Sequence, residues 1–467
     1  MIRPTRLALL PVALAVCLAF PAVARAGVNE DILQELKALK LRMAELEKKL
    51  EAQDAKIAET PQGMTVEQQQ ELSRITVKTE AMEDARDALG LKNLKISGYM
   101  DPTFIYNQRQ DRAGFQFLNR MQDGEAYNYD NSFFGAAVID FTKETDGGSR
   151  WRLTLAPNRG IGMGIDGNSP IHEASVSIPL TDLQTRFIAG QIPDWSGYEY
   201  LPATQNKLIT HNLLFDFTLP FAYTGAGLEL TRDKWIVKSV LGNVTSSMKA
   251  QRDTSPAWAY RVDYAKGEFQ GFGFAGVHGK AKNFTENVLD IAGEVVAQRD
   301  SRIDLFELDA YFIRGDWTVQ GQWSIGRQAD ASITAASDGS LRAAQWWGLS
   351  ALAAYKFQPR LEGTIRADFI NNRKNGGGLL GYTSADGRNG LGPAQVDADG
   401  DGLIDAPDRG VNRSALTFGL SYLYNLNTTF KFEYRLDHAS GPVFLDVKNG
   451  SFKKDNQLIG ASVLVSF

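Results

Sequence analysis

The last residues of the chain, 457–467, alternate between apolar and polar positions. Counting back from the terminal Phe467, every second residue is apolar or small, and most of the residues between them are serine or glycine. The apolar set is Val465, Val463, Ala461 and Ile459, and the polar set is Ser466, Ser462 and Gly460. A period of two over about ten residues is typical of a β-strand with one face in an apolar environment and one in a polar environment. We therefore expect the chain to end on such a strand.

The same alternation recurs through residues 94–467 and predicts about sixteen strands. They begin near Leu94, Ser132, Arg150, Ile171, Gln184, Tyr223, Lys234, Ala257, Gln270, Ile303, Trp317, Ala344, Arg360, Arg413, Thr428 and Gln457. Tight turns and long loops alternate along the chain. The long loops are 107–131, 158–170, 192–222, 244–256, 281–302, 327–343, 373–412 and 439–456. A meander with all its long loops at one end is the pattern of an outer-membrane barrel.

Charged and apolar side chains occupy opposite faces of these predicted strands. In residues 150–155, for example, Trp151 and Leu153 alternate with Arg150 and Arg152. The apolar face must point toward lipid, because a charge there costs about 2–4 kcal/mol at mid-bilayer. We therefore predict an all-β transmembrane barrel of about 16 antiparallel strands. Its charged inner face predicts a water-filled channel and not a packed core.

Residues 1–26 have the pattern of a signal peptide. A basic start is followed by an apolar run from Leu7 to Phe20, and Ala24 and Ala26 have the spacing of a cleavage site. The run is too short and wrongly flanked for a spanning helix. From residue 94 onward no stretch approaches 18 consecutive apolar residues, so we expect no transmembrane helix.

Residues 27–60 carry a heptad repeat that predicts a coiled coil. Its apolar positions are Ile32, Leu36, Leu39, Met43, Leu46, Leu50 and Ile57. Charges that would face each other across a parallel pair of helices are opposite in sign, in the pairs Glu35 with Lys40, Arg42 with Glu47, and Lys49 with Asp54. This favours a parallel homo-oligomer over a helix packed on the protein's own surface, and leaves dimer and trimer open. Residues 61–93 are predicted to be a second helical segment and linker.

Three stretches carry a resemblance to a known group of proteins. They are 94–106 (LKISGYMDPTFIY), 114–119 (GFQFLN) and 151–157 (WRLTLAP). With the leader, the coiled coil and the terminal phenylalanine, they resemble Gram-negative porins, and within that group an uncharacterised proteobacterial family of barrel proteins with an N-terminal coiled coil. The resemblance implies a homotrimer in the outer membrane with its coiled coil in the periplasm. It also implies that the third long loop, 192–222, folds into the lumen and narrows it.

Strand parity assigns a set of charged residues to the lumen. These candidate pore-lining residues are Arg152, Arg186, Arg261, Asp263, Glu307, Asp309, Glu362, Arg366, Asp368, Lys431, Glu433, Arg435 and Asp437. They can form a solvated wall of cross-strand ion pairs or a track that selects ions by charge. Both signs occur in similar numbers, so the sequence assigns no preference for anions or cations. The formal net charge of -5 is a sum over the whole chain and does not decide it.

The longest predicted external loop, 373–412, contains a candidate calcium site. Its acidic residues have the spacing of a calcium-binding loop, and the candidate ligands are Asp397, Asp399, Asp401, the Leu403 carbonyl, Asp405 and Asp408. Aspartate stands at the last position, where a longer glutamate is usual, and no helices flank the loop. The alternative is a flexible acidic loop. We expect a weak, structural Ca²⁺ site here and no cofactor required for function.

The function that these patterns favour is a porin for passive diffusion of small hydrophilic solutes, without catalysis. An alternative is a structural barrel that anchors a periplasmic coiled coil toward the cell wall, with a possible peptidoglycan contact. A minor alternative is an outer-membrane phospholipase, because His438 and Ser440 are spaced to share the lipid-facing side of a strand. The four histidines show no metal-ligand spacing, and no basic patch indicates nucleic-acid binding.

Overall fold

The computed structural model describes residues 74–75, 77–78, 90–118, 134–156, 170–249, 251–267, 269–289, 295–332, 340–374, 391–400, 402–406 and 409–467. Its contacts divide the chain into two units, 1–92 and 93–467, and the second unit holds the strands. Among the described residues, no helix is both long and apolar enough to span a membrane. The predicted signal peptide, coiled coil and most of the second helical segment lie outside the described residues.

The second unit consists of β-strands and one short described helix. The strands are β1 (Leu94–Met100), β2 (Thr103–Asn107), β3 (Arg112–Gln116), β4 (Ala137–Glu144), β5 (Arg150–Leu155), β6 (Ile171–Asp182), β7 (Thr185–Pro193), β8 (Ala222–Arg232), β9 (Trp235–Val244), β10 (Ala257–Gly267), β11 (Gln270–Leu289), β12 (Val295–Arg314), β13 (Trp317–Gln328), β14 (Ala344–Gln358), β15 (Leu361–Lys374), β16 (Arg413–Asn425), β17 (Thr428–Ala439), β18 (Phe444–Asp446), β19 (Ser451–Lys453) and β20 (Asp455–Ser466). The helix is α4 (Leu213–Thr218).

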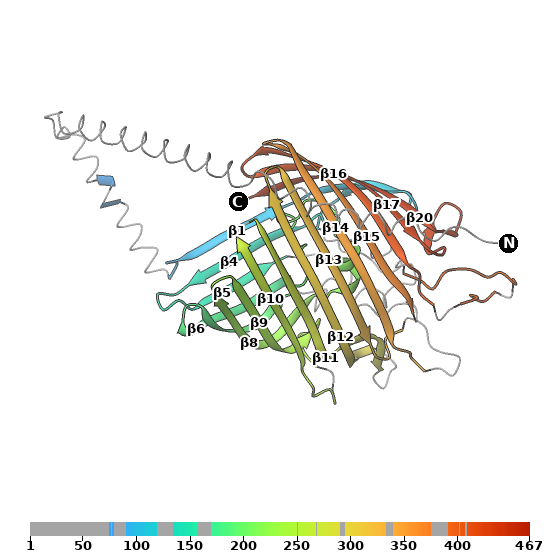
Figure 1. Cartoon of the computed structure of the whole chain (residues 1–467), viewed down its shortest axis with the longest axis horizontal. Helices are drawn as coiled ribbons and strands as arrows, with labels where there is room; N and C mark the ends of the chain where they lie inside the picture. Colours follow the sequence, from blue (N-terminus) through green and yellow to red (C-terminus); the bar gives the residue numbers. More distant parts are fainter. Residues whose placement is uncertain are drawn as a thin grey trace, which may run out of the picture. The chain divides into compact units, whose positions relative to one another are not determined.

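The sheet closes on itself as an antiparallel barrel (Figure 1). From β4 to β17 each strand pairs with its neighbours in sequence, and β20 pairs with both β17 and β1. At the seam, the Gly98 amide donates to the Phe467 carbonyl at 3.1 Å and the Phe467 amide donates to the Gly98 carbonyl at 3.0 Å. The fold is a closed 16-strand antiparallel barrel.

The described sheet has 18 strand segments because the first barrel strand is interrupted. β1 and β2 both pair with β20, and they are separated by Asp101 and Pro102. Proline has no amide hydrogen for the ladder. The Asp101 carboxylate accepts bonds from the amides of Gly135 at 3.2 Å and Ala136 at 2.6 Å, which restores contact with the next strand. Within the interrupted strand, β1 pairs with β4 and β2 pairs with β3, so β3 extends the wall past the end of β4.

The two faces of the strands differ as the sequence predicts. On β17, Phe432 is 52% exposed, whereas its neighbours Lys431 and Glu433 are buried. Trp258 on β10 and Ile459 on β20 are likewise exposed on the outside. An exposed apolar exterior around a buried charged interior is the reverse of a soluble protein and is the arrangement of a membrane barrel.

The predicted strand positions agree with the structure within a few residues, but strands also occupy parts of three predicted long loops: β3 in 107–131, β18 and β19 in 439–456, and the ends of β11 and β12 in 281–302. The sequence predicts a long loop at 281–302, but β11 and β12 extend through most of it and are 20 residues long each. Residues 281–283 and 299–302 belong to this extended pair. The prediction was wrong because the sequence of this stretch shows no regular alternation of apolar and polar residues.

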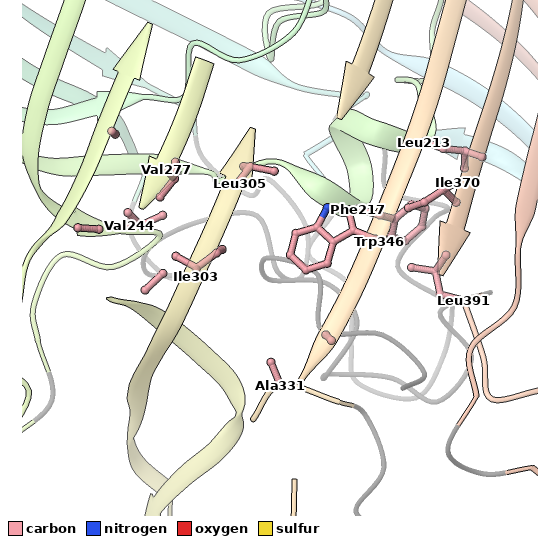
Figure 2. Packing of buried hydrophobic residues seen from close by; sticks show 14 of the residues in the cluster. Leu213, Phe217, Val244, Val277, Ile303, Leu305, Ala331, Trp346, Ile370 and Leu391 are labelled. Atoms are coloured by element: carbon pink, nitrogen blue, oxygen red, sulfur yellow. The ribbon is translucent and has the colours of Figure 1, made fainter. Parts of the chain in front are cut away.

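Part of the barrel interior is a packed hydrophobic cluster. Leu213 and Phe217 of α4 lie beside Trp346 of β14 and Ile370 of β15, and Figure 2 shows them within a larger cluster that includes Val277. All five side chains are almost completely buried. The prediction of a lumen that is not a packed core is therefore wrong for this part of the barrel, because the inward positions there are apolar and the third long loop packs against them.

Candidate functional site: the lumen and its inserted segment

The third long connection, residues 194–221, enters the barrel, and we call it the inserted segment. It leaves the wall at β7 and returns at β8, and its helix α4 contacts β13, β14 and β15. Asn212 caps this helix, since its side-chain oxygen accepts a bond from the Phe215 amide at 2.8 Å. The inward fold that the resemblance implies for 192–222 is therefore present. We call β13–β17 the far wall and β4–β10 the near wall.

Arg366 on β15 is the central anchor of the inserted segment. Its guanidinium donates to the Glu199 carboxylate at 2.8 Å, to the Thr210 carbonyl at 2.7 Å and to the His211 carbonyl at 2.8 Å. It also pairs with Asp368 on its own strand at 3.0 Å. The side chain is fully buried, so each of these charge-assisted bonds forms away from water.

Glu433 and Arg435 on β17 hold the same stretch of the segment. The Glu433 carboxylate accepts from the amides of Ile209 at 2.6 Å and Thr210 at 3.0 Å, and from the Thr210 hydroxyl. Arg435 donates to the Thr210 hydroxyl at 3.0 Å and to the His211 carbonyl at 2.8 Å. The carboxylate of Glu433 thus binds backbone amides of the inserted segment, while the guanidinium of Arg435 binds a backbone carbonyl. This pairing fixes the orientation of the segment's backbone against β17.

Lysines complete the attachment at the other end of this stretch. Lys431 donates to the carbonyls of Ala203 and Asn206, each at 2.7 Å. Lys207, which belongs to the segment, forms an ion pair with Glu362 of β15 at 2.8 Å. Predicted lumen residues of the far wall therefore face inward, but they are covered by the inserted segment.

The near wall carries charges that remain in contact with solvent. Arg152 pairs with Asp140 at 2.8 Å and with Glu173 at 3.3 Å, and its side chain is 46% exposed. Lys238 on β9 pairs with Glu229 on β8 at 3.4 Å. The Lys238 ammonium also lies 5.9 Å from the ring centre of Trp195, at the start of the inserted segment.

Arg261 forms the third charged group of the near wall. It pairs with Asp263 on its own strand at 2.6 Å and bidentately with Asp309 of β12. The Asp263 side chain is 33% exposed, whereas Arg261 and Asp309 are buried. Nearby on β12, Glu307 is fully buried.

A cavity of about 310 Å³ lies between the inserted segment and the near wall. Its wall side includes Arg152, Glu173 and Lys238, and its segment side includes aromatic residues such as Trp195 and Phe215. Asp194, in the connection outside the strands, also lines it, and burial raises the pKa of its carboxyl to about 6. The wall side of this cavity is therefore charged, whereas its segment side is largely aromatic and aliphatic.

Arg186 has a different environment from the other predicted lumen residues. It is buried and donates to the Ser177 hydroxyl at 2.6 Å and to the Gly148 carbonyl at 2.7 Å. Gly148 belongs to the tight turn between β4 and β5. On the far wall, Asp437 pairs with Arg413 at 2.9 Å, and both side chains are fully buried. Arg413 was not among the predicted lumen residues, although strand parity could have included it.

Three of the predicted calcium ligands lie together. One carboxylate oxygen each from Asp397, Asp399 and Asp405 falls within 4.8 Å of the others, and all three residues are exposed. The Asp397 carboxylate also accepts bonds from the amides of Gly400 at 2.7 Å and Gly402 at 2.9 Å. Leu403 is exposed, and Asp401 and Asp408 lie outside the described residues. Calcium binding stays a prediction.

The pair of residues behind the phospholipase alternative lies on the barrel's outer side. His438 Nδ1 is 2.5 Å from a carboxylate oxygen of Asp455 on β20, and both side chains are exposed. The Ser440 hydroxyl accepts a bond from the Asn412 amide at 3.1 Å. The sequence spacing alone did not indicate Asp455.

The predicted oligomerisation residues Ile32, Leu36, Leu39, Met43, Leu46, Leu50 and Ile57 all lie outside the described residues. The coiled coil and the homo-oligomer therefore stay predictions. The sequence also gave no indication of the part played by Thr210, whose amide, carbonyl and hydroxyl all bond to the far wall. Two of those three groups belong to the backbone, so the residue type carries little signal.

The closed barrel, its apolar exterior and its charged lumen with an inserted segment define a porin-like barrel protein. The chain belongs to the family described as "Protein of unknown function (DUF3138)", whose model matches residues 58–467. No curated protein sequence matches it significantly.

Solved structures with a similar fold include three outer-membrane proteins. Outer-membrane expressed OmpT of Vibrio cholerae is 9% identical, with 80% of this chain and 97% of that chain covered and a TM-score of 0.49. An anion-selective porin from Comamonas acidovorans is 10% identical, with 80% and 99% covered and a TM-score of 0.47. The outer membrane channel DcaP of Acinetobacter baumannii is 12% identical, with 80% and 97% covered and a TM-score of 0.46. At this distance, function has to be inferred from this chain's own residues.

Proposed function

We propose that this protein is an outer-membrane channel for passive diffusion of small hydrophilic solutes and ions. The observation that carries the proposal is the difference between the two sides of the inserted segment. On the far wall, Arg366 and Arg435 are fully buried, whereas Arg152 and Asp263 on the near wall keep much of their side chains in solvent. Because a charged group is retained in a membrane protein only where it is paired or hydrated, the exposed set supports a hydrated path along the near wall.

The same path favours cations. On the near wall and the adjoining edge of β12, four cations face five carboxylates, namely Arg152, Arg186, Lys238 and Arg261 against Asp140, Glu173, Glu229, Asp263 and Asp309. Asp194 and Asp216 of the inserted segment add acidic groups at the cavity. An excess of carboxylates along the path raises the local concentration of cations and lowers the energy barrier to their passage. We therefore propose a weakly cation-selective channel.

The test is single-channel conductance of the purified barrel in a planar bilayer with a KCl gradient. We expect stepwise openings and a reversal potential whose sign indicates cation preference. A silent barrel that is folded by gel mobility and circular dichroism would refute the channel and would favour the anchoring alternative. Openings with an anion-selective reversal potential would refute the charge argument but keep the channel.

We further propose a homotrimer, with the coiled coil of residues 27–60 in the periplasm. The support is the heptad repeat with its complementary charges, together with the resemblance to porins. The mass of the detergent-extracted complex tests the stoichiometry. Deletion of residues 27–60 should weaken the assembly, and an unchanged trimer would assign assembly to the barrel alone.

A second candidate function has one specific observation in its favour. The His438–Asp455 pair supplies the oriented base that a serine hydrolase needs, and Ser440 follows His438 by two residues on the outer side. Under this proposal, the protein hydrolyses lipid esters in the adjoining leaflet. Ser440→Ala should abolish such hydrolysis, while a folded wild-type barrel without lipase activity would refute it.

A further inference from the structure

A row of polar and charged residues crosses five strands on the outside of the barrel. Strand pairing places His278 of β11 opposite Asp304 of β12, and Asp304 opposite Arg327 of β13. Arg327 in turn lies opposite Gln345 of β14, which lies opposite Lys374 of β15. These five strands lie side by side across one face of the barrel (Figure 1). We call this set the outer row.

The outer row faces outward and lies toward the end with the long connections. Two residues along β13 from Arg327, and therefore on the same face, is Ile325, which is 43% exposed on the barrel exterior. In the same way Phe306 follows Asp304, and Trp347 follows Gln345. The charged row thus borders directly on the apolar exterior, as at the boundary between headgroups and acyl chains.

Two cations of the outer row, Arg327 and Lys374, have no acidic partner among the described residues. His278 pairs with Asp304 at 3.0 Å, and Asp304 also pairs with Arg302 at 3.2 Å, so the one carboxylate of the row is already engaged. Among the described residues, no carboxylate lies within ion-pair distance of Arg327 or Lys374. Both side chains are exposed. Lys280 and Arg302 lie opposite each other, two residues along β11 and β12 from His278 and Asp304, and add further positive charge.

A groove of about 550 Å³ joins this charge to the apolar surface. Its lining includes the cations Arg327 and Lys374, the apolar side chains of Phe306, Ile325 and Trp347, and the paired His278 and Asp304. A groove with a cationic rim and an aromatic, aliphatic floor matches a molecule that has an anionic head and apolar chains. The formal net charge of the chain is -5, so a cationic patch here is a local feature and not the average of the surface.

We propose that this groove binds the phosphorylated headgroup of a lipid in the leaflet at the long-connection end. Arg327 and Lys374 contact the phosphate, since two cations without an ion pair among the described residues complement its two negative charges. The acyl chains run down the barrel over Phe306, Ile325 and Trp347. Under the proposed topology this leaflet is the outer one, so the ligand is a phosphorylated glycolipid. The site is independent of conduction through the lumen.

The test compares lipid binding by the folded full-length protein in detergent, using native mass spectrometry and thermal shift. The probes are diphosphorylated lipid A, the same lipid without phosphate, phosphatidylcholine and inorganic phosphate. The variant is Arg327→Gln/Lys374→Gln, and the matched control is Lys234→Gln/Arg360→Gln, which removes two exposed cations at tight turns. We expect the variant to bind lipid A about thirtyfold more weakly, roughly fivefold for each cation at a charged membrane surface.

Several outcomes would overturn the proposal. Equal binding by wild type and variant, or an equal loss in the control, would remove the assignment to Arg327 and Lys374. Equal binding of phosphatidylcholine or dephosphorylated lipid would mean that only the apolar floor is recognised. Competition by inorganic phosphate at the same concentration as lipid would make the site a free-anion site. If the double variant does not fold, the single variant Lys374→Gln, which changes an exposed side chain, gives the same comparison with about a fivefold effect.

Discussion

Removing Arg366 should release the inserted segment from the far wall. Its guanidinium bonds to Glu199, to the carbonyls of Thr210 and His211, and to Asp368, all away from water. Loss of one partner from a buried ion pair costs about 3–5 kcal/mol, because the other charge stays buried without compensation. Since about 1.4 kcal/mol is a tenfold change in an equilibrium, Arg366→Ala shifts the balance between docked and undocked segment by roughly two to four orders of magnitude.

The expected result is a wider and noisier channel. Arg366→Ala should raise single-channel conductance and admit larger neutral sugars in a liposome-swelling assay. Glu433→Ala should act in the same direction, because the amides of Ile209 and Thr210 lose their acceptor. The double variant should show less than the sum of the two effects, since both residues hold the same stretch of chain.

Arg186→Ala is the matched control for this experiment. It also removes a buried arginine from a strand, but the bonds of Arg186 run to Ser177 and to the turn carbonyl of Gly148, and none runs to the inserted segment. It should lower stability toward urea without changing conductance. A folded Arg366→Ala barrel with wild-type conductance, or an equal increase in Arg186→Ala, would refute the anchoring role of Arg366.

Three further predictions concern the outer face, the passage and the external loop. Phe432→Arg should lower the free energy of unfolding from vesicles by about 2–4 kcal/mol, because the side chain at this position faces lipid. Phe432→Leu should have only a small effect, and equal effects of the two variants would contradict the lipid-facing assignment. Asp263→Asn should reduce cation preference in a reversal-potential measurement, and an increase would overturn the carboxylate argument. Millimolar Ca²⁺ should raise the thermal midpoint relative to chelator, and Asp397→Asn/Asp405→Asn should remove the difference; a midpoint insensitive to Ca²⁺ in wild type would exclude the site.

Strand positions and faces were predictable because both depend on neighbours in sequence. The alternation around Trp151 or Phe432 is set by a period of two, and a lipid environment on one face makes that period visible. The docking of the inserted segment depends instead on partners that are distant in the chain, such as Arg366 and Glu199, which are 167 residues apart. The sequence therefore indicates that both side chains are charged and near the lumen, but it does not indicate that they neutralise each other.

The hydrophobic cluster inside the barrel also depends on partners that are distant in the chain. Trp346 and Ile370 occupy inward positions, where parity alone predicts contact with water. They become a core only because Leu213 and Phe217 of α4 cover them. A barrel strand that is apolar on its inner face near one end is thus a sequence signal for an inserted segment.

The position of the inserted segment decides which charges act on a solute. On the far wall, acids and bases pair with each other and with the backbone of residues 199–211, so they lie out of reach of the passage. On the near wall Arg152 and Asp263 keep part of their side chains in solvent, and together with Asp309 of the adjoining β12 the carboxylates outnumber the cations. A sum of the charges over the whole lumen averages the two walls and indicates no preference for anions or cations. Under the proposed channel function, ion selectivity therefore follows from the near wall and the adjoining edge of β12, because the field of a hydrated group reaches the permeating ion while a buried, neutralised pair contributes little.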